Sequence, residues 1–152
     1  MKGNSLKKSI ITAAILVAAA YAGQSLAHSA GATIDAAGNN ASATDLAEVF
    51  CYNDGSGEPD HLFVQIRDNS SPVAGLLLSA QIYKDNQMTN VTDTVSGDSG
   101  YSNSAVLKGG FGAYDISVSK TKAGARNFDI TYHCLTAGDV HTGTDITVFQ
   151  GQ

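Results

Sequence analysis

The feature that most constrains the fold is a strict alternation of apolar and polar residues near the C-terminal end of the chain. The apolar side chains that share one parity there are Phe128, Ile130, Tyr132 and Cys134. A period of two is typical of a β-strand with one buried face, so Cys134 is expected to point into a core. A turn at 136–138 and a second alternating run follow, whose predicted inward residues are Val140, Ile146 and Val148. The pattern predicts a β-hairpin.

Similar alternating segments recur through the preceding part of the chain. They fall at about 44–53, 61–67, 75–84 and 113–122, with shorter candidates at 90–95 and 104–108. Turns rich in Gly, Asp and Ser separate them, and no helical periodicity is present after residue 27. About seven to nine short strands with this spacing are typical of an all-β antiparallel sandwich.

The first 27 residues have the composition of a secretory signal peptide. Three lysines in the first eight residues precede an apolar run at 10–20, and residues 25–27 fit a cleavage site with small residues. The apolar run is shorter than the ~20 residues that span a bilayer, so we expect cleavage and no membrane span afterwards. Cleavage after Ala22 is an alternative to cleavage after Ala27. Either cut predicts a periplasmic or secreted protein.

The segment 28–43 differs in composition from the predicted strands. It consists mostly of Ala, Gly, Ser and Asn, with Ile34 as its one large apolar residue. Such a segment buries little apolar surface, which predicts a flexible N-terminal arm with at most one edge strand at about 33–36. A single sandwich domain is then expected over 44–152.

The chain has two cysteines, Cys51 and Cys134, both on apolar strand faces. In a protein addressed to an oxidising compartment, two cysteines predict one disulfide. The chain-entropy estimate for a loop of this length is about 4.5 kcal/mol of stabilisation. A structural role is therefore favoured over a reactive thiol.

The sequence Tyr132-His133-Cys134, with Cys51 in an early strand, resembles the Tyr-x-Cys of immunoglobulin domains. The resemblance implies an immunoglobulin-like sandwich in which the disulfide joins the two sheets. Because this architecture hosts many unrelated functions, the resemblance predicts the fold alone.

The exported part is strongly acidic. It retains six basic residues and all fourteen acidic ones, a formal charge of −8. Nucleic acids and anionic membrane surfaces require a basic footprint, so we exclude both as partners. The charge suits a soluble exported protein, or one that attracts cations.

All four histidines lie in the exported part, at His28, His61, His133 and His141. If Val140 faces inward, the hairpin register places His133 opposite His141, with Cβ atoms about 5 Å apart. Two imidazoles at this separation can hold one metal ion. The same register predicts an acidic strip beside them, formed by Asp129, Asp139 and Asp145.

A cut after Ala27 would make His28 the first residue, whose amine and imidazole can chelate one metal together. Such a terminal histidine resembles the start of periplasmic copper carriers of the sandwich type and of lytic polysaccharide monooxygenases. Nitrogen-rich ligation favours Cu(II), Zn or Ni over Ca. No further motif of either family is present, so copper-dependent oxidase or monooxygenase activity is not expected.

Two functions are therefore considered from the sequence. The first is an exported, non-catalytic β-sandwich that binds a protein partner or contributes to an envelope structure. The alternative is a periplasmic copper-binding protein that uses His133 and His141, with His28 or His61 as further ligands. The sequence has no nucleophile elbow and no phosphate-binding loop, which leaves no motif-based argument for an enzyme.

Overall fold

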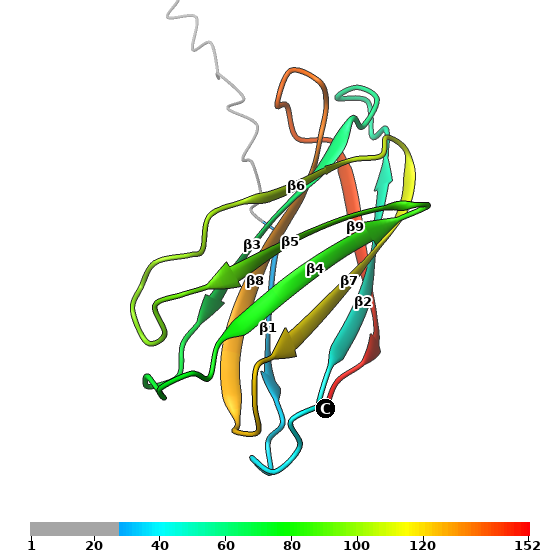
Figure 1. Ribbon diagram of the computed structural model, residues 1–152. Coiled ribbons are helices and arrows are strands. Elements are labelled where there is room, and N and C mark those ends of the chain that lie inside the picture. Colours follow the sequence, from blue (N-terminus) through cyan, green and yellow to red (C-terminus); the bar gives the residue numbers. More distant parts are fainter. Residues whose placement is uncertain (1–27) are drawn as a thin grey trace, which may run out of the picture.

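A computed structural model describes residues 28–152 as two antiparallel sheets packed face to face (Figure 1). The four-stranded sheet has the order β1 (Ser29–Ile34), β8 (Arg126–Leu135), β3 (His61–Asp68) and β6 (Ala105–Lys108). The five-stranded sheet has the order β5 (Gln87–Asp93), β4 (Leu78–Lys84), β7 (Gly112–Lys120), β2 (Asp45–Tyr52) and β9 (Gly143–Gln150). These strands confirm the predicted all-β sandwich.

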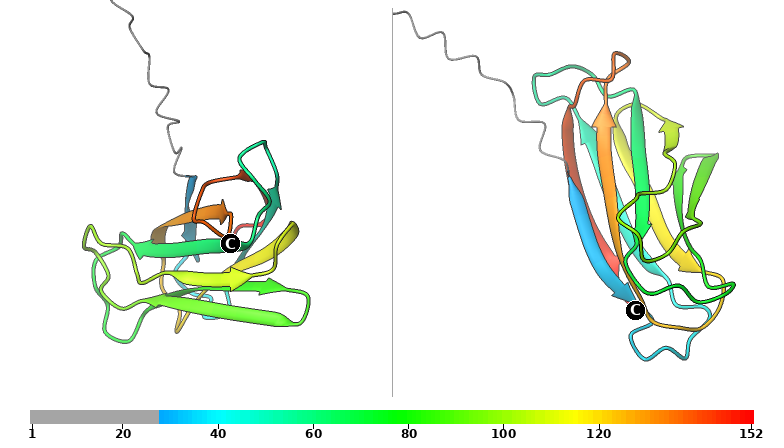
Figure 2. Two further views of the ribbon diagram at one scale, coloured as in Figure 1. Left: turned by 90° about the horizontal axis from the view of Figure 1, so that it is seen from above. Right: turned by 90° about the vertical axis from the view of Figure 1, so that its left-hand side faces the viewer.

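The predicted leader, residues 1–27, lies outside the described residues. Within residues 28–152, no helix has the length and apolar character that crossing a membrane requires. Figure 2 shows the two layers from above and from the side.

The core lies between the sheets and is built from the inward residues of each alternating strand. Val49, Leu62, Ile82 and Tyr114 are fully buried there. Cys51 of β2 and Cys134 of β8 form a disulfide with a Cα–Cα distance of 5.5 Å. Because the two strands belong to different sheets, the disulfide joins the sheets, as predicted.

The predicted hairpin at 127–143 is wrong. Strand β8 pairs with β1 and β3, whereas β9 pairs with β2 in the other sheet. The chain therefore crosses between sheets, and only a single bridge joins Leu135 to His141. Alternation shows that each strand has one buried face. It does not show whether two successive strands pair in one sheet or lie in two facing sheets, because both arrangements bury that face.

The crossover also changes the partners assigned by the hairpin register. Val140 lies in the turn and is 52% exposed, so it does not face inward. Asp129 lies opposite Gly31 and Arg67, and Asp145 lies opposite Phe50. The predicted acidic strip of Asp129, Asp139 and Asp145 does not form.

The segment expected to be a flexible arm is instead part of the sandwich. Residues 29–34 form edge strand β1, which pairs with β8 along its whole length. At its end, Ile34 is fully buried and Asp35 accepts a hydrogen bond of 2.7 Å from Lys120, whose side chain is also buried. The Lys120 ammonium group holds the pKa of Asp35 well below its ordinary value. Backbone pairing and this ion pair replace the apolar anchors that the segment lacks.

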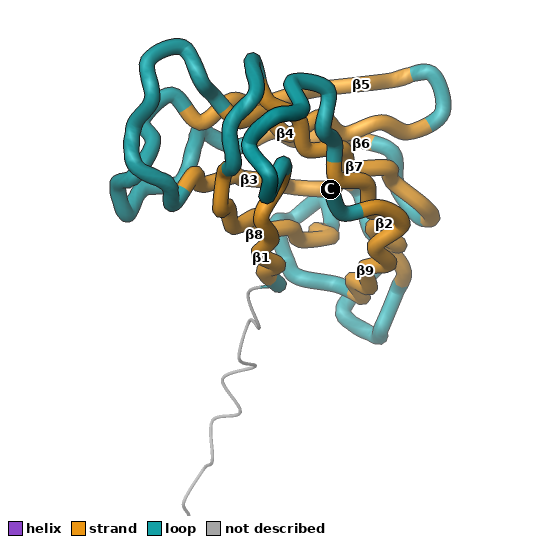
Figure 3. Tube along the Cα trace, turned by 90° about the horizontal axis from the view of Figure 1, so that it is seen from below, coloured by secondary structure: helices purple, strands orange, loops and turns teal. Residues whose placement is uncertain are grey.

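Strands β1 and β9 are the terminal strands of their sheets and lie on the same side of the molecule (Figure 3). His28 immediately precedes β1, and His141 lies two residues before the start of β9. The fold thus brings the beginning of the described chain close to the turn between β8 and β9.

Candidate metal centre

Three histidines from distant parts of the sequence converge at one end of the sandwich. They are His28, His133 and His141, and one ligand atom of each lies within 4.8 Å of the others. The rings of His133 and His141 have centroids 4.2 Å apart, and the His28 ring lies 6.3 Å from each of them. Within residues 28–152, no other three potential metal ligands are brought this close together.

The β1–β8 pairing positions the first two histidines. His133 points to the outer face of its sheet because its neighbours Tyr132 and Cys134 point into the core. The backbone N–H of Tyr132 donates to the carbonyl oxygen of His28 at 3.0 Å, which extends the ladder by one residue beyond β1. His28 is therefore fixed beside the strand that carries His133.

The turn between β8 and β9 positions the third histidine. The N–H of Thr136 donates to the carbonyl of Val140 at 2.9 Å, and the N–H of Asp139 donates to the carbonyl of Thr136 at 3.0 Å. Asp139 adopts a φ of 59°, which allows this tight reversal. The reversal returns His141 to a position beside the end of β8.

Thr142 holds the residue next to His141 in place. It is only 3% exposed, and its N–H donates to the carbonyl of Cys134 at 3.0 Å. Its hydroxyl lies 2.7 Å from the carbonyl oxygen of Gly57 and 3.0 Å from that of Tyr52, so it donates to one of them at a time. Thr142 thus ties the His141 turn to both sheets.

Replacing Thr142 with valine is expected to weaken metal binding by about tenfold, the size of effect typical for residues that orient metal ligands. The substitution keeps the shape of the side chain but removes the hydroxyl that anchors the turn. Competition titrations with a coloured chelator would measure the change. Thr147→Val, at an exposed position of β9, is the matched control. Unchanged affinity in Thr142→Val would show that the turn needs no such anchor.

The surroundings keep two of the imidazoles neutral. Burial, and then the neighbouring His141 and His28, lower the pKa of His133 to about 4. Burial and His28 also lower the pKa of His141, against the opposing effect of Asp54. Neutral imidazoles have a free lone pair, so a metal ion at neutral pH need not displace a proton from either residue.

Two nitrogen atoms of the cluster have no hydrogen-bond partner within the described residues. They are Nδ1 of His28 and Nδ1 of His133, and both are buried. Buried polar atoms without partners are uncommon, because each lacks the stabilisation that water would give it. Their presence among three converging imidazoles favours a bound metal ion, which would accept the nitrogen lone pairs.

The spacing is close to that of a bound ion. Two imidazole nitrogens bound at about 2.0–2.1 Å to one ion are at most about 4.2 Å apart. From 4.8 Å, the two nitrogens of a pair would have to close by about 0.6 Å in a linear arrangement and by about 1.4 Å in a tetrahedral one. All three side chains are half-buried, so small rotations are sufficient.

The other predicted site residues lie outside the cluster. His61 is buried at the start of β3, with Nδ1 2.9 Å from an Asp60 oxygen and Nε2 3.5 Å from Asp139. Asp129 accepts hydrogen bonds from Arg67 and Asn69, and Asp145 is exposed on β9. The triad consequently contains imidazole nitrogens and no carboxylate.

The lowered pKa of His133 predicts that the metal-free protein loses stability as the pH falls from 6.5 towards about 4. In this interval the unfolded chain binds a proton at His133 and the folded protein does not, so protons favour unfolding. Urea unfolding at both ends of the interval measures the effect. His133→Phe should lose less stability over the same interval. An equal loss in both proteins would contradict the shift.

No family model matches the chain, and neither the curated proteins nor the solved structures include one detectably similar to it. The immunoglobulin-like resemblance therefore stays a prediction.

Proposed function

We propose that this protein is an exported, non-catalytic copper-binding protein whose metal ligands are His28, His133 and His141. The convergence of three imidazoles, two of which have buried, unpartnered nitrogens, is the observation that supports the proposal. The three ligands are half-buried, so an ion held by them would lie close enough to solvent for delivery or exchange.

The donor set supports copper over the other ions of the outer cell compartments. Calcium and magnesium prefer oxygen ligands, whereas the cluster offers only imidazole nitrogens. Among divalent first-row ions, Cu(II) binds nitrogen sites most tightly. The acidic net charge of the protein also raises the local concentration of cations.

Cleavage of the leader after Ala27 would add a fourth nitrogen donor. The amine of His28 would then be free, and it would chelate the ion together with the imidazole of the same residue. A cut after Ala22 leaves the three imidazoles as the protein ligands. The triad is part of the proposed site in both cases.

Intact mass and electron paramagnetic resonance of the exported protein test this function. We expect one copper ion per chain after dialysis, with hyperfine coupling to several nitrogens in the Cu(II) form. The mass under denaturing conditions also locates the leader cut. A protein that retains neither Cu(II) nor Cu(I) when each is offered would refute the proposal.

A second candidate function is a non-catalytic module that binds a protein partner or belongs to an envelope structure. Exposed aromatic side chains support it, since Phe111 is 61% exposed and packs edge-on against Phe50, with ring centroids 5.4 Å apart. Aromatic residues are enriched at protein interfaces. A photo-crosslinker at position 111, compared with one at position 147, tests for a partner in the native compartment.

A further inference from the structure

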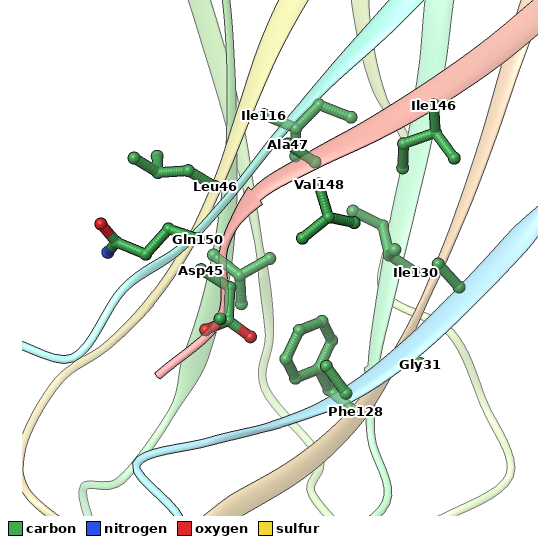
Figure 4. Close-up of a pocket in the computed structure, with 14 residues that line it drawn as sticks. Gly31, Asp45, Leu46, Ala47, Ile116, Phe128, Ile130, Ile146, Val148 and Gln150 are labelled. Carbon is green, nitrogen blue, oxygen red and sulfur yellow. The ribbon is translucent and has the colours of Figure 1, made fainter.

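An apolar groove opens between the edge strands β1 and β9, where the two sheets part (Figure 4). Its volume is about 110 Å³. The apolar side chains that line it include Ala30, Ala32, Phe128, Ile130, Ile146 and Val148. Val148 is 65% exposed at its rim, so the groove is accessible from solvent.

One carboxyl group, that of Asp45, lies among these apolar side chains. Asp45 is only 8% exposed, and it lines the groove together with Phe128 (Figure 4). One oxygen accepts a hydrogen bond of 2.7 Å from the N–H of Gln152. The other oxygen, Oδ2, is buried and has no partner within the described residues.

No other side chain that lines the groove is free to pair with this oxygen. Asp45 is the only ionisable residue among the fourteen that line it. The amide of Gln150, the one other polar side chain among the fourteen lining residues, donates instead to the carbonyl of Thr44 at 2.6 Å. A buried carboxyl oxygen without a donor is unfavourable, and a ligand that supplies one would relieve the cost.

We infer that this groove is a binding site for a small apolar molecule that carries one protonated amine. The apolar body would pack against Phe128, Ile130 and Ile146. A rotation of the Asp45 side chain would bring Oδ2, which is buried in the empty groove, within reach of the ammonium group. An apolar cavity of about 150 Å³ accommodates benzene. The groove, at about 110 Å³, is smaller but open on one side, so a body of about six carbons would lie partly within it and partly at its mouth. The acidic charge of the exported part favours a cationic ligand over a neutral one.

This site is independent of the proposed copper site. It uses none of the three histidines, and Asp45 lies at the opposite end of β2 from Tyr52, which adjoins the turn that carries His141. Loss of copper binding and loss of amine binding are therefore separate results.

Methyl NMR of the metal-free exported protein tests the inference with benzylamine as the probe. We expect the methyl signals of Ile130, Ile146 and Val148 to shift with saturation in the millimolar range, as suits a ligand of about eight heavy atoms. Benzyl alcohol, which has the same ring but no charge, should bind several-fold more weakly.

Asp45→Asn should weaken benzylamine binding by about tenfold, because it removes the charge but keeps an oxygen that can accept from Gln152. Asp115→Asn, on the exposed face of β7, is the matched control and should leave binding unchanged. Ala32→Leu narrows the groove without altering Asp45, and it should also reduce binding. It tests the site even if Asp45→Asn fails to fold.

Three outcomes would overturn the inference. The first is no shift of the groove methyl signals with benzylamine. The second is equal binding of benzylamine and benzyl alcohol that Asp45→Asn leaves unchanged. The third is a shift of the same signals with protein concentration alone, which would show that a second copy of the chain occupies the groove.

Discussion

Replacing either His133 or His141 with alanine is expected to weaken copper binding by at least about a hundredfold, more than the loss of a residue that only orients a ligand. Each substitution removes one of three imidazoles whose ligand atoms lie within 4.8 Å of one another. The two imidazoles that remain cannot enclose the ion without water or another donor. Competition titrations against a chelator of known affinity, at pH 7, would measure the loss.

His61→Ala is the matched control for these variants. His61 is also buried, but its ring contacts Asp60 and Asp139 and takes no part in the cluster. Copper affinity should therefore remain that of the parent protein. If His61→Ala weakens binding as much as His133→Ala, or if both cluster variants bind as tightly as the parent, the proposed site is wrong.

The second large effect concerns stability, because Cys51→Ser removes the only disulfide between the sheets in the described part of the chain. Cys51 and Cys134 are separated by 83 residues, for which the chain-entropy estimate is about 4.5 kcal/mol. Domains of this size are stable by about 5–15 kcal/mol, so much of the total would be lost. Urea unfolding of the oxidised parent and the variant, both metal-free, measures the difference.

The paired substitution of Cys51 and Cys134 by serine is the control that separates the disulfide from the free thiol. It should be destabilised about as much as Cys51→Ser, but without the free thiol that Cys51→Ser leaves at Cys134. The reduced parent protein should show a similar loss. A parent whose unfolding is the same before and after reduction would contradict a stabilising role for the bridge.

The sequence predicted the strands and the disulfide because both depend on local or pairwise information. Alternation along Phe128 to Cys134 is visible within a few residues, and two cysteines have only one possible pairing within the chain. The meeting of His133 and His141 was also predicted, but from a hairpin that does not exist. The turn brings His141 back to the end of β8 even though β9 continues in the other sheet.

The role of residues 28–35 was not predictable from their composition. Apolar alternation predicts a strand, and this segment has almost none. Its position depends on backbone pairing with β8 and on a buried carboxylate, Asp35, whose partner Lys120 is 85 residues away. His28 consequently joins the other histidines through a contact that no local pattern encodes.

The position of Asp45 was likewise not predictable from local sequence patterns. Parity placed residues 44–53 in a strand but gave no reason to expect an unpaired carboxyl group between two sheet edges. That position follows from the sheet order, in which β1 and β9 are both terminal strands. Strand order depends on contacts that are distant in sequence.

The separation of the ligands along the chain has a consequence for when the metal is acquired. His28 precedes His133 by 105 residues, and the two are neighbours only after β1 has paired with β8. An extended polypeptide in transit through a membrane therefore carries the ligands but has no binding site. If the leader directs export as we propose, the protein crosses the membrane without its ion and becomes competent to bind copper only where it folds.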